Sequence, residues 1–136
     1  MTYAAPIERA NLSKPSVDMN TLLEGIQTCF DCAQACTADA DADLAEPQGH
    51  EMIRCIRLCL DCADVCLATG KILSRQTAFA LPTARAALQA CVLTCNVCGD
   101  ECEQHARHGF AHCRTCMEAC RHCEQACTTV LSSLPR

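Results

Sequence analysis

The clearest periodicity along the chain is a seven-residue repeat of apolar positions, and most of these positions are cysteine. The sixteen cysteines form four groups, and within each group successive members are alternately three and four residues apart. Because a helix turns by about 100° per residue, such steps keep each group on one face. The pattern therefore predicts four helices, each with one stripe of thiols. The groups are Cys29, Cys32, Cys36; Cys55, Cys59, Cys62, Cys66; Cys91, Cys95, Cys98, Cys102; and Cys113, Cys116, Cys120, Cys123, Cys127.

Signals for helix ends support this division. Thr21 and Glu24 have the spacing of a capping box before the first group. Pro47 and Pro82 fit the first turn of the second and third helices, and Gly109 separates the third from the fourth. The helices are expected near residues 20–45, 47–77, 82–107 and 110–133.

The short connections between these segments determine the expected fold. They favour antiparallel neighbours, so the predicted fold class is all-α, an antiparallel up-down-up-down four-helix bundle with a Cys-lined core. We expect residues 1–18 to form an irregular N-terminal arm and residues 19–136 to form the bundle.

Composition and charge argue against several classes of protein. The net charge is −5 and no basic cluster is present, so nucleic acid is not an expected partner. No apolar stretch approaches the roughly 20 residues that cross a bilayer, so no membrane association is expected. Residues 1–18 lack an export signal, which indicates a cytoplasmic protein.

A cytoplasmic location makes the thiols candidates for metal binding. Cytosolic thiols stay reduced, which argues against a disulfide scaffold, and sixteen cysteines in one register exceed what simple packing requires. Four Zn²⁺ ions in Cys₄ sites would leave a large negative charge in the core. Ferredoxin-type Fe–S ligands come from turn-rich loops. Cu(I) prefers thiolates, and one ion per bridging sulfur gives a neutral core.

A four-helix bundle of this size with C-x₂-C-x₃-C repeats on every helix and no export signal resembles the cytosolic bacterial copper storage proteins. The resemblance covers about residues 20–133. It implies that multiple Cu(I) ions lie inside the bundle, with all sixteen cysteines as ligands. It also implies histidines at the end where metal enters, and a homo-oligomer, often a tetramer.

The residues that extend the cysteine stripes distinguish the two ends of the bundle. At one end the extensions are Asp39, Met52, His105 and the neighbourhood of His112, all of which have metal-binding groups. At the other end they are mostly apolar, and they include Leu22, Gly25, Thr69, Leu73, Leu88, Val130 and Leu134. The polar end is therefore the predicted mouth, and the apolar end is the predicted plug.

Several residues other than cysteine are candidate metal ligands, although each could also have an ordinary structural role. His105 is the strongest, because it continues the stripe inward from Cys102, whereas His112, His108 and Met52 are more evenly balanced. Asp31 and Asp61 each precede a cysteine and could accept protons or bind copper transiently, with Asp61 the better candidate. The remaining histidines, His50 and His122, are expected on the surface.

The function that follows is non-enzymatic Cu(I) storage and detoxification. A zinc or mixed soft-metal buffer, and a thiol redox or Fe–S protein, are the alternatives. No single C-x-x-C stands apart from the repeat, as it would in a thioredoxin-type enzyme. A copper donor or acceptor protein is a further expected partner.

Overall fold

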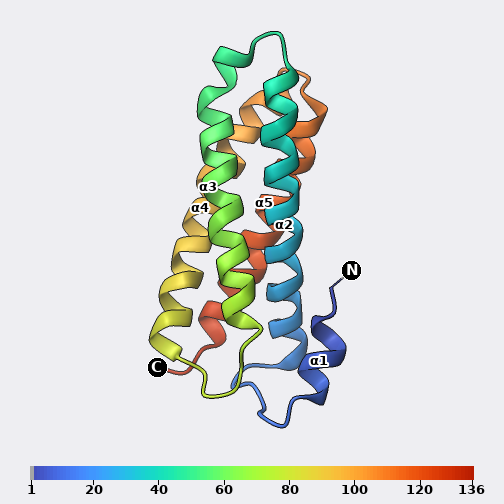
Figure 1. The fold of residues 1–136 in the computed structure, drawn as a ribbon. Helices are drawn as coiled ribbons and strands as arrows, with labels where there is room; N and C mark the ends of the chain where they lie inside the picture. The colour runs from blue at the N-terminus through green and yellow to red at the C-terminus, as the bar shows by residue number, and fades with distance from the viewer. Residues whose placement is uncertain (1) are drawn as a thin grey trace.

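The computed structural model describes residues 2–136, and no β-strand occurs in that part of the chain. Four long helices stand side by side and alternate in direction (Figure 1). Helix α2 packs against α3 and α5, and α4 packs against the same two helices. The predicted all-α, antiparallel four-helix bundle is confirmed. The four helices are α2 (Met19–Ala45), α3 (Ile53–Leu73), α4 (Leu81–Arg107) and α5 (Ala111–Ser133).

The start of α2 differs in detail from the expectation. Asp18 is the N-cap, and its side chain accepts a hydrogen bond from the backbone N–H of Thr21 at 3.1 Å. An acidic N-cap satisfies one of the free N–H groups of the first turn and opposes the helix dipole. The predicted capping box of Thr21 and Glu24 is therefore wrong, although the helix itself begins within one residue of the expected position.

The second bundle helix is shorter than predicted. A 3₁₀ segment, η1 (Gly49–Met52), precedes α3, which ends at Leu73. Pro47 lies in the turn before η1 and not in a first helical turn, because proline favours an extended conformation in the preceding residue. Glu46 accordingly has φ −72° and ψ 141°. Pro82 does lie in the first turn of α4, as expected.

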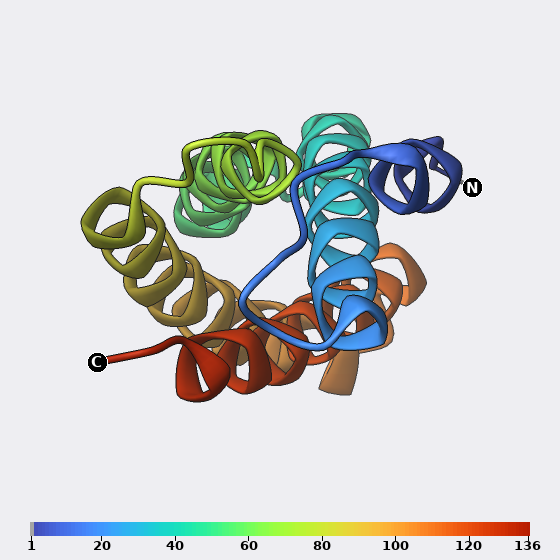
Figure 2. The same cartoon turned by 90° about the horizontal axis from the view of Figure 1, so that it is seen from below.

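The N-terminal arm contains a short helix, α1 (Ala4–Ala10), that packs against α2, so the arm is not irregular throughout. Residues 11–18 then cross the lower end of the bundle before α2 begins (Figure 2). Val17 from this segment is buried and belongs to the core. The arm therefore covers the end predicted to be an apolar plug, where Leu73, Leu88 and Val130 are also buried as expected.

The core of the bundle is made of small side chains. Every cysteine has at most 1% of its surface exposed. Helices α2 and α3 approach closely near Gly70, where a Cβ atom would lie 3.1 Å from the ring of Phe30 and 3.2 Å from Cβ of Cys29. A glycine at this position lets α3 pack directly against the thiol stripe of α2.

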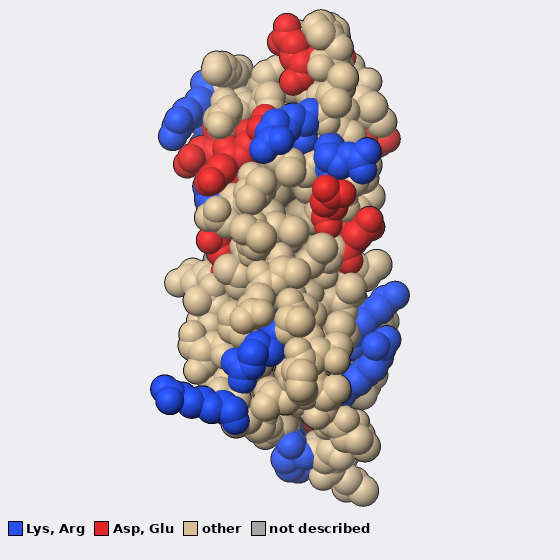
Figure 3. All heavy atoms as spheres, turned by 90° about the vertical axis from the view of Figure 1, so that its left-hand side faces the viewer, with Lys and Arg blue, Asp and Glu red and all other residues tan. Residues whose placement is uncertain are grey.

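Charge is distributed unevenly along the bundle axis. On the face shown in Figure 3, Asp and Glu side chains gather in the upper half together with several Lys and Arg, and the charged side chains of the lower half are nearly all Lys and Arg. The upper half is the end where α2 finishes and α5 begins. Among residues 2–136, no helix has the length and apolar character of a membrane span.

Candidate metal centre

The thiols form one continuous column along the bundle axis. Every cysteine except Cys113 has its Sγ within 4.0 Å of another Sγ, and these contacts connect all of them. At one end Cys29 and Cys127 are 3.5 Å apart, and at the other end Cys55 and Cys102 are 4.0 Å apart. All sixteen are free thiols. The four predicted stripes therefore converge, and we define this array as the thiol column.

The spacing within the thiol column suits shared metal ligation. In several groups of four cysteines all Sγ atoms lie within 4.8 Å of one another, for example Cys32, Cys62, Cys66 and Cys95. Cys32 and Cys62 each belong to a second such group, with Cys36 and Cys120. Two sulfurs that bind one ion at about 2.3 Å are at most about 4.6 Å apart. Neighbouring ions can therefore share sulfurs without large movements of the helices.

Burial opposes ionisation of the thiols in the column when no metal is bound. Hydrogen bonds between thiols raise the pKa of some members, such as Cys29 and Cys36, and lower the pKa of others, such as Cys62 and Cys123. A metal ion must displace these protons, because the thiolate is the ligand. Loading the column consequently releases protons and replaces thiol hydrogen bonds with metal–sulfur bonds.

Asp39 connects the thiol column to the predicted mouth. It lies on α2, is 3% exposed, and its Oδ2 accepts hydrogen bonds from Cys59 at 3.4 Å and Cys102 at 3.6 Å. Burial raises its pKa, although a hydrogen bond to His112 opposes that effect. Asp39 is thus a buried carboxylate placed directly above the last thiols.

His112 lies between this carboxylate and solvent. Its side chain is 26% exposed, its Nδ1 is 2.5 Å from Oδ1 of Asp39, and its Nε2 is 2.9 Å from Oε1 of Glu46. Burial opposes protonation of the ring, but the hydrogen bonds to both carboxylates outweigh it and raise its pKa. The structure places His112 at the mouth, as expected, with one ring nitrogen facing inward.

Asp43 is a second buried carboxylate at the same end. It is 0% exposed, and its Oδ1 accepts a hydrogen bond from Cys113 at 3.6 Å. Its Oδ2 has no hydrogen-bond partner among the described residues. Burial, followed by the neighbouring Cys55 and Asp39, raises its pKa to about 8. Asp43 is therefore neutral over much of the physiological range.

Sequence reasoning missed Asp43 and did not rank Asp39 among the candidate ligands. The signal was present, because both residues continue the cysteine stripe of α2 beyond Cys36 by the same steps of three and four. The predicted extension of the stripe goes one step beyond Cys36, to Asp39, and Asp43 lies one step further. Aspartate is seldom fully buried, so this second position was not predicted in the core.

The other residues predicted at the mouth have different surroundings from those of His112. His105 is not directed at a thiol; its Nε2 is 2.9 Å from Oε2 of Glu101, and its ring packs edge-on against Phe110. His108 is exposed and donates to the backbone carbonyl of Gln104. Met52 is 1% exposed and belongs to the core. These three residues line a groove above the column, and Glu101 orients His105 within it.

Asp61 and Asp31 do not lie beside the thiol column. The Asp61 side chain is 54% exposed and lies 3.9 Å from Arg57, and Asp31 is exposed next to Gln27. A residue one position before a stripe cysteine is rotated by about 100° from it. The expectation that these carboxylates adjoin the column is therefore wrong.

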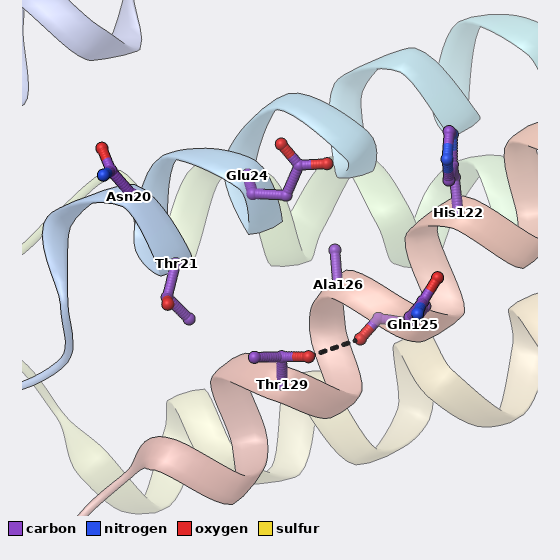
Figure 4. Close-up of a pocket in the computed structure, with 7 residues that line it drawn as sticks. All are labelled: Asn20, Thr21, Glu24, His122, Gln125, Ala126 and Thr129. Atoms are coloured by element: carbon purple, nitrogen blue, oxygen red, sulfur yellow. Dashed lines mark hydrogen bonds between the residues drawn. The ribbon is translucent and has the colours of Figure 1, made fainter.

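The remaining two histidines are on the surface, as expected. His50 is 81% exposed. His122 lines a groove between α2 and α5 with Asn20, Thr21, Glu24 and Gln125 (Figure 4). This groove is on the outside of the bundle, away from the mouth.

Comparison with known proteins agrees with this geometry. The copper storage protein family matches residues 18–132. The copper storage protein Ccsp from Streptomyces lividans, loaded with 10 copper equivalents, is 47% identical with a TM-score of 0.93, covering 96% of this chain and 99% of that one. A five-copper structure of the cytosolic copper storage protein from the same organism is 51% identical with a TM-score of 0.82, covering 85% and 96%. No curated protein sequence matches. The chain belongs to the copper storage protein family.

Proposed function

We propose that this protein stores Cu(I) in the cytosol by binding many ions as thiolates along the thiol column. The single observation that carries the proposal is the unbroken series of Sγ contacts from Cys29 to Cys55 and Cys102. Family membership and copper-loaded structures of the Streptomyces lividans relative support the same metal. The role is storage and not catalysis.

The net charge left in the core distinguishes Cu(I) from divalent metal ions in this column. When each Cu(I) takes two sulfurs and each thiolate bridges two ions, the numbers of ions and thiolates match and the core is neutral. Divalent ions in separate Cys₄ sites would each leave two negative charges in a core that water does not reach. Burial of all sixteen cysteines therefore favours binding of Cu(I), because a Cu(I) thiolate column is neutral.

The mouth supplies a route for the metal. His112 contacts solvent, its Nδ1 contacts Asp39, and Asp39 contacts Cys59 and Cys102. Weaker nitrogen and oxygen ligands can pass a soft ion inward to thiolates, which hold it more strongly. The carboxylates of the upper half attract cations, or a basic surface of a copper donor or acceptor protein, to this end.

Anaerobic titration of the reduced protein with Cu(I), in competition with a chelator of known affinity, tests the proposal. We expect saturation near one Cu(I) per cysteine. We also expect ultraviolet charge-transfer absorption that rises linearly until saturation. Saturation near four equivalents, with preference for Zn²⁺, would instead establish the zinc buffer.

We also propose that the protein self-associates, as the family resemblance implies. Ile53, Leu60 and Leu67 recur every seven residues on α3 and are 65%, 43% and 40% exposed. A row of exposed apolar side chains on one helix is typical of an interface. Sedimentation analysis of the wild type and of a Leu60→Glu, Leu67→Glu variant tests this, with an oligomer expected only for the wild type.

A further inference from the structure

Four donor groups at the mouth form a cluster that differs chemically from the thiol column. Nδ1 of His112 lies 2.5 Å from Oδ1 of Asp39, 3.6 Å from Oδ1 of Asp43 and 3.6 Å from Sγ of Cys113. Asp43 and Cys113 are themselves 3.6 Å apart. Cys113 lies at the edge of the thiol column, where Cys55 is its neighbouring thiol. We call these four residues the mouth cluster.

One atom of the mouth cluster lacks the partner that burial requires. Oδ2 of Asp43 is inaccessible to solvent and has no hydrogen-bond partner within residues 2–136, on a side chain that is 0% exposed. A buried oxygen without a hydrogen-bond partner destabilises the folded protein. Such a group in a native structure is explained by a bound ion or water. The other oxygen of the same carboxylate, Oδ1, lies 3.6 Å from both the His112 imidazole and the Cys113 thiol.

The orientation of His112 matches that of a metal ligand. Its Nδ1 faces the cluster, and its Nε2 contacts Oε1 of Glu46 at 2.9 Å. In metal sites the ring nitrogen that does not bind the ion usually donates its proton to a carboxylate, which fixes the tautomer and ring position. Glu46 is the residue immediately after α2 and occupies that second position.

We propose that the mouth cluster binds one Zn²⁺ ion through Asp39, Asp43, His112 and Cys113, separately from the Cu(I) store. The donors are one nitrogen, one sulfur and two carboxylate groups, a set that Zn²⁺ accepts in tetrahedral sites. Cu(I) prefers sulfur and gains little from carboxylate oxygen. On binding, His112 gives up its Nδ1 proton, Cys113 its thiol proton and Asp43 its carboxyl proton to solvent, and Zn²⁺ takes their place.

The charge balance favours this cluster over the column for a divalent ion. Two carboxylates, one thiolate and a neutral imidazole leave one negative charge around Zn²⁺, next to a partly exposed histidine. A Cys₄ group inside the column would leave two negative charges with no contact to water. The first equivalent of Zn²⁺ therefore goes to the mouth.

Co²⁺, which reports its ligands by absorption, tests the proposal when it is added anaerobically to the reduced, copper-free, full-length protein. We expect one equivalent to give tetrahedral d–d bands with the charge-transfer intensity of a single thiolate. One equivalent of Zn²⁺ should remove these bands. Asp39→Asn and Asp43→Asn should each lower the affinity for Co²⁺ by about tenfold or more, which is the loss of affinity typical when residues around a metal site are replaced. Asp31→Asn and Asp61→Asn, which change exposed carboxylates, are the matched controls.

Two results would overturn the proposal. One is charge-transfer intensity corresponding to four thiolates, and the other is equal Co²⁺ affinity in the Asp43→Asn and Asp31→Asn proteins. Circular dichroism verifies that each variant keeps its helices, and His112→Gln carries the same test if Asp43→Asn does not fold. Cu(I) capacity, measured separately on the wild type and on the control proteins Asp31→Asn and Asp61→Asn, should stay near one ion per cysteine, so failure of the zinc site and failure of copper storage give different results.

Discussion

The Nδ1 atom of His112 on α5 lies 2.5 Å from Oδ1 of Asp39 on α2, and this contact connects the solvent-facing rim to the buried thiols. The other oxygen of Asp39 already accepts hydrogen bonds from Cys59 and Cys102. An ion that replaces the proton of His112 is therefore one carboxylate away from the thiol column. The pair therefore lies between solvent and the thiol column.

Replacing His112 with Gln should slow copper loading but leave capacity nearly unchanged. The thiolates set the equilibrium for a soft ion, whereas the imidazole only provides an intermediate ligand. Stopped-flow absorption after mixing with a Cu(I)–chelator complex measures the rate, and His122→Gln, on the outer surface of the same helix, is the control. A large loss of capacity at unchanged rate would make His112 part of the store.

Replacing Cys120 with Ser should lower the Cu(I) capacity by about one or two ions, because each bridging thiolate serves two ions. Cys120 is central in the column, with Sγ 3.8 Å from Cys32 and 3.7 Å from Cys36. Thr115→Ser, at an exposed position of α5, should bind as many ions as the wild type. Equal capacity in both variants would contradict a column in which every thiol is used.

The copper-free protein should lose stability as the pH rises from 5 to 8. Asp43 has a pKa of about 8 in the folded protein against an ordinary value of 3.8, so the folded state holds a proton that the unfolded state has lost. Stability from this group is fully present below the unfolded pKa and disappears as pH approaches 8, with a slope of at most about 1.4 kcal/mol per pH unit. The upward shifts of Asp39 and His112 act in the same direction.

Asp43→Asn isolates this effect, because asparagine stays neutral at every pH. Relative to the wild type, the variant should gain stability steadily between pH 5 and pH 8. Urea unfolding of the reduced proteins, followed by circular dichroism, gives both curves. Parallel curves for the two proteins would mean that Asp43 ionises normally.

Gly70→Ala should destabilise the bundle by about 1–2 kcal/mol, since the new methyl group would press on Cβ of Cys29 and on the Phe30 ring. Gly99→Ala is the matched comparison in α4, because its Cβ would meet only the flexible end of Arg121. There the better helix propensity of alanine should stabilise the protein by about 0.5–1 kcal/mol. Thermal unfolding distinguishes the two, and stabilisation of both would show that α2 and α3 separate easily near Gly70.

The cysteine repeat was sufficient to predict the bundle and the burial of the thiols, because spacing alone assigns residues to one face of a helix. It could not predict the 3₁₀ segment at Gly49–Met52, which depends on how Pro47 closes the turn. Nor could it show that Glu101 holds the ring of His105 and that Arg57 lies near Asp61. Both pairs are i,i+4 neighbours within one helix, a spacing that the sequence contains, but the cysteine repeat does not show which way each side chain turns. The position of Asp43, in contrast, could have been predicted, because Asp43 continues the cysteine repeat of α2.

The arm that crosses the lower end of the bundle has a consequence for the order in which metal is withdrawn. Val17 and the buried apolar residues Leu73, Leu88 and Val130 close this end of the column. With the proposed entry at the His112 end, copper that moves down toward Cys29 and Cys127 would lie beneath the ions that follow it. The column would then act as a last-in, first-out stack, from which a cell would recover its most recent copper first.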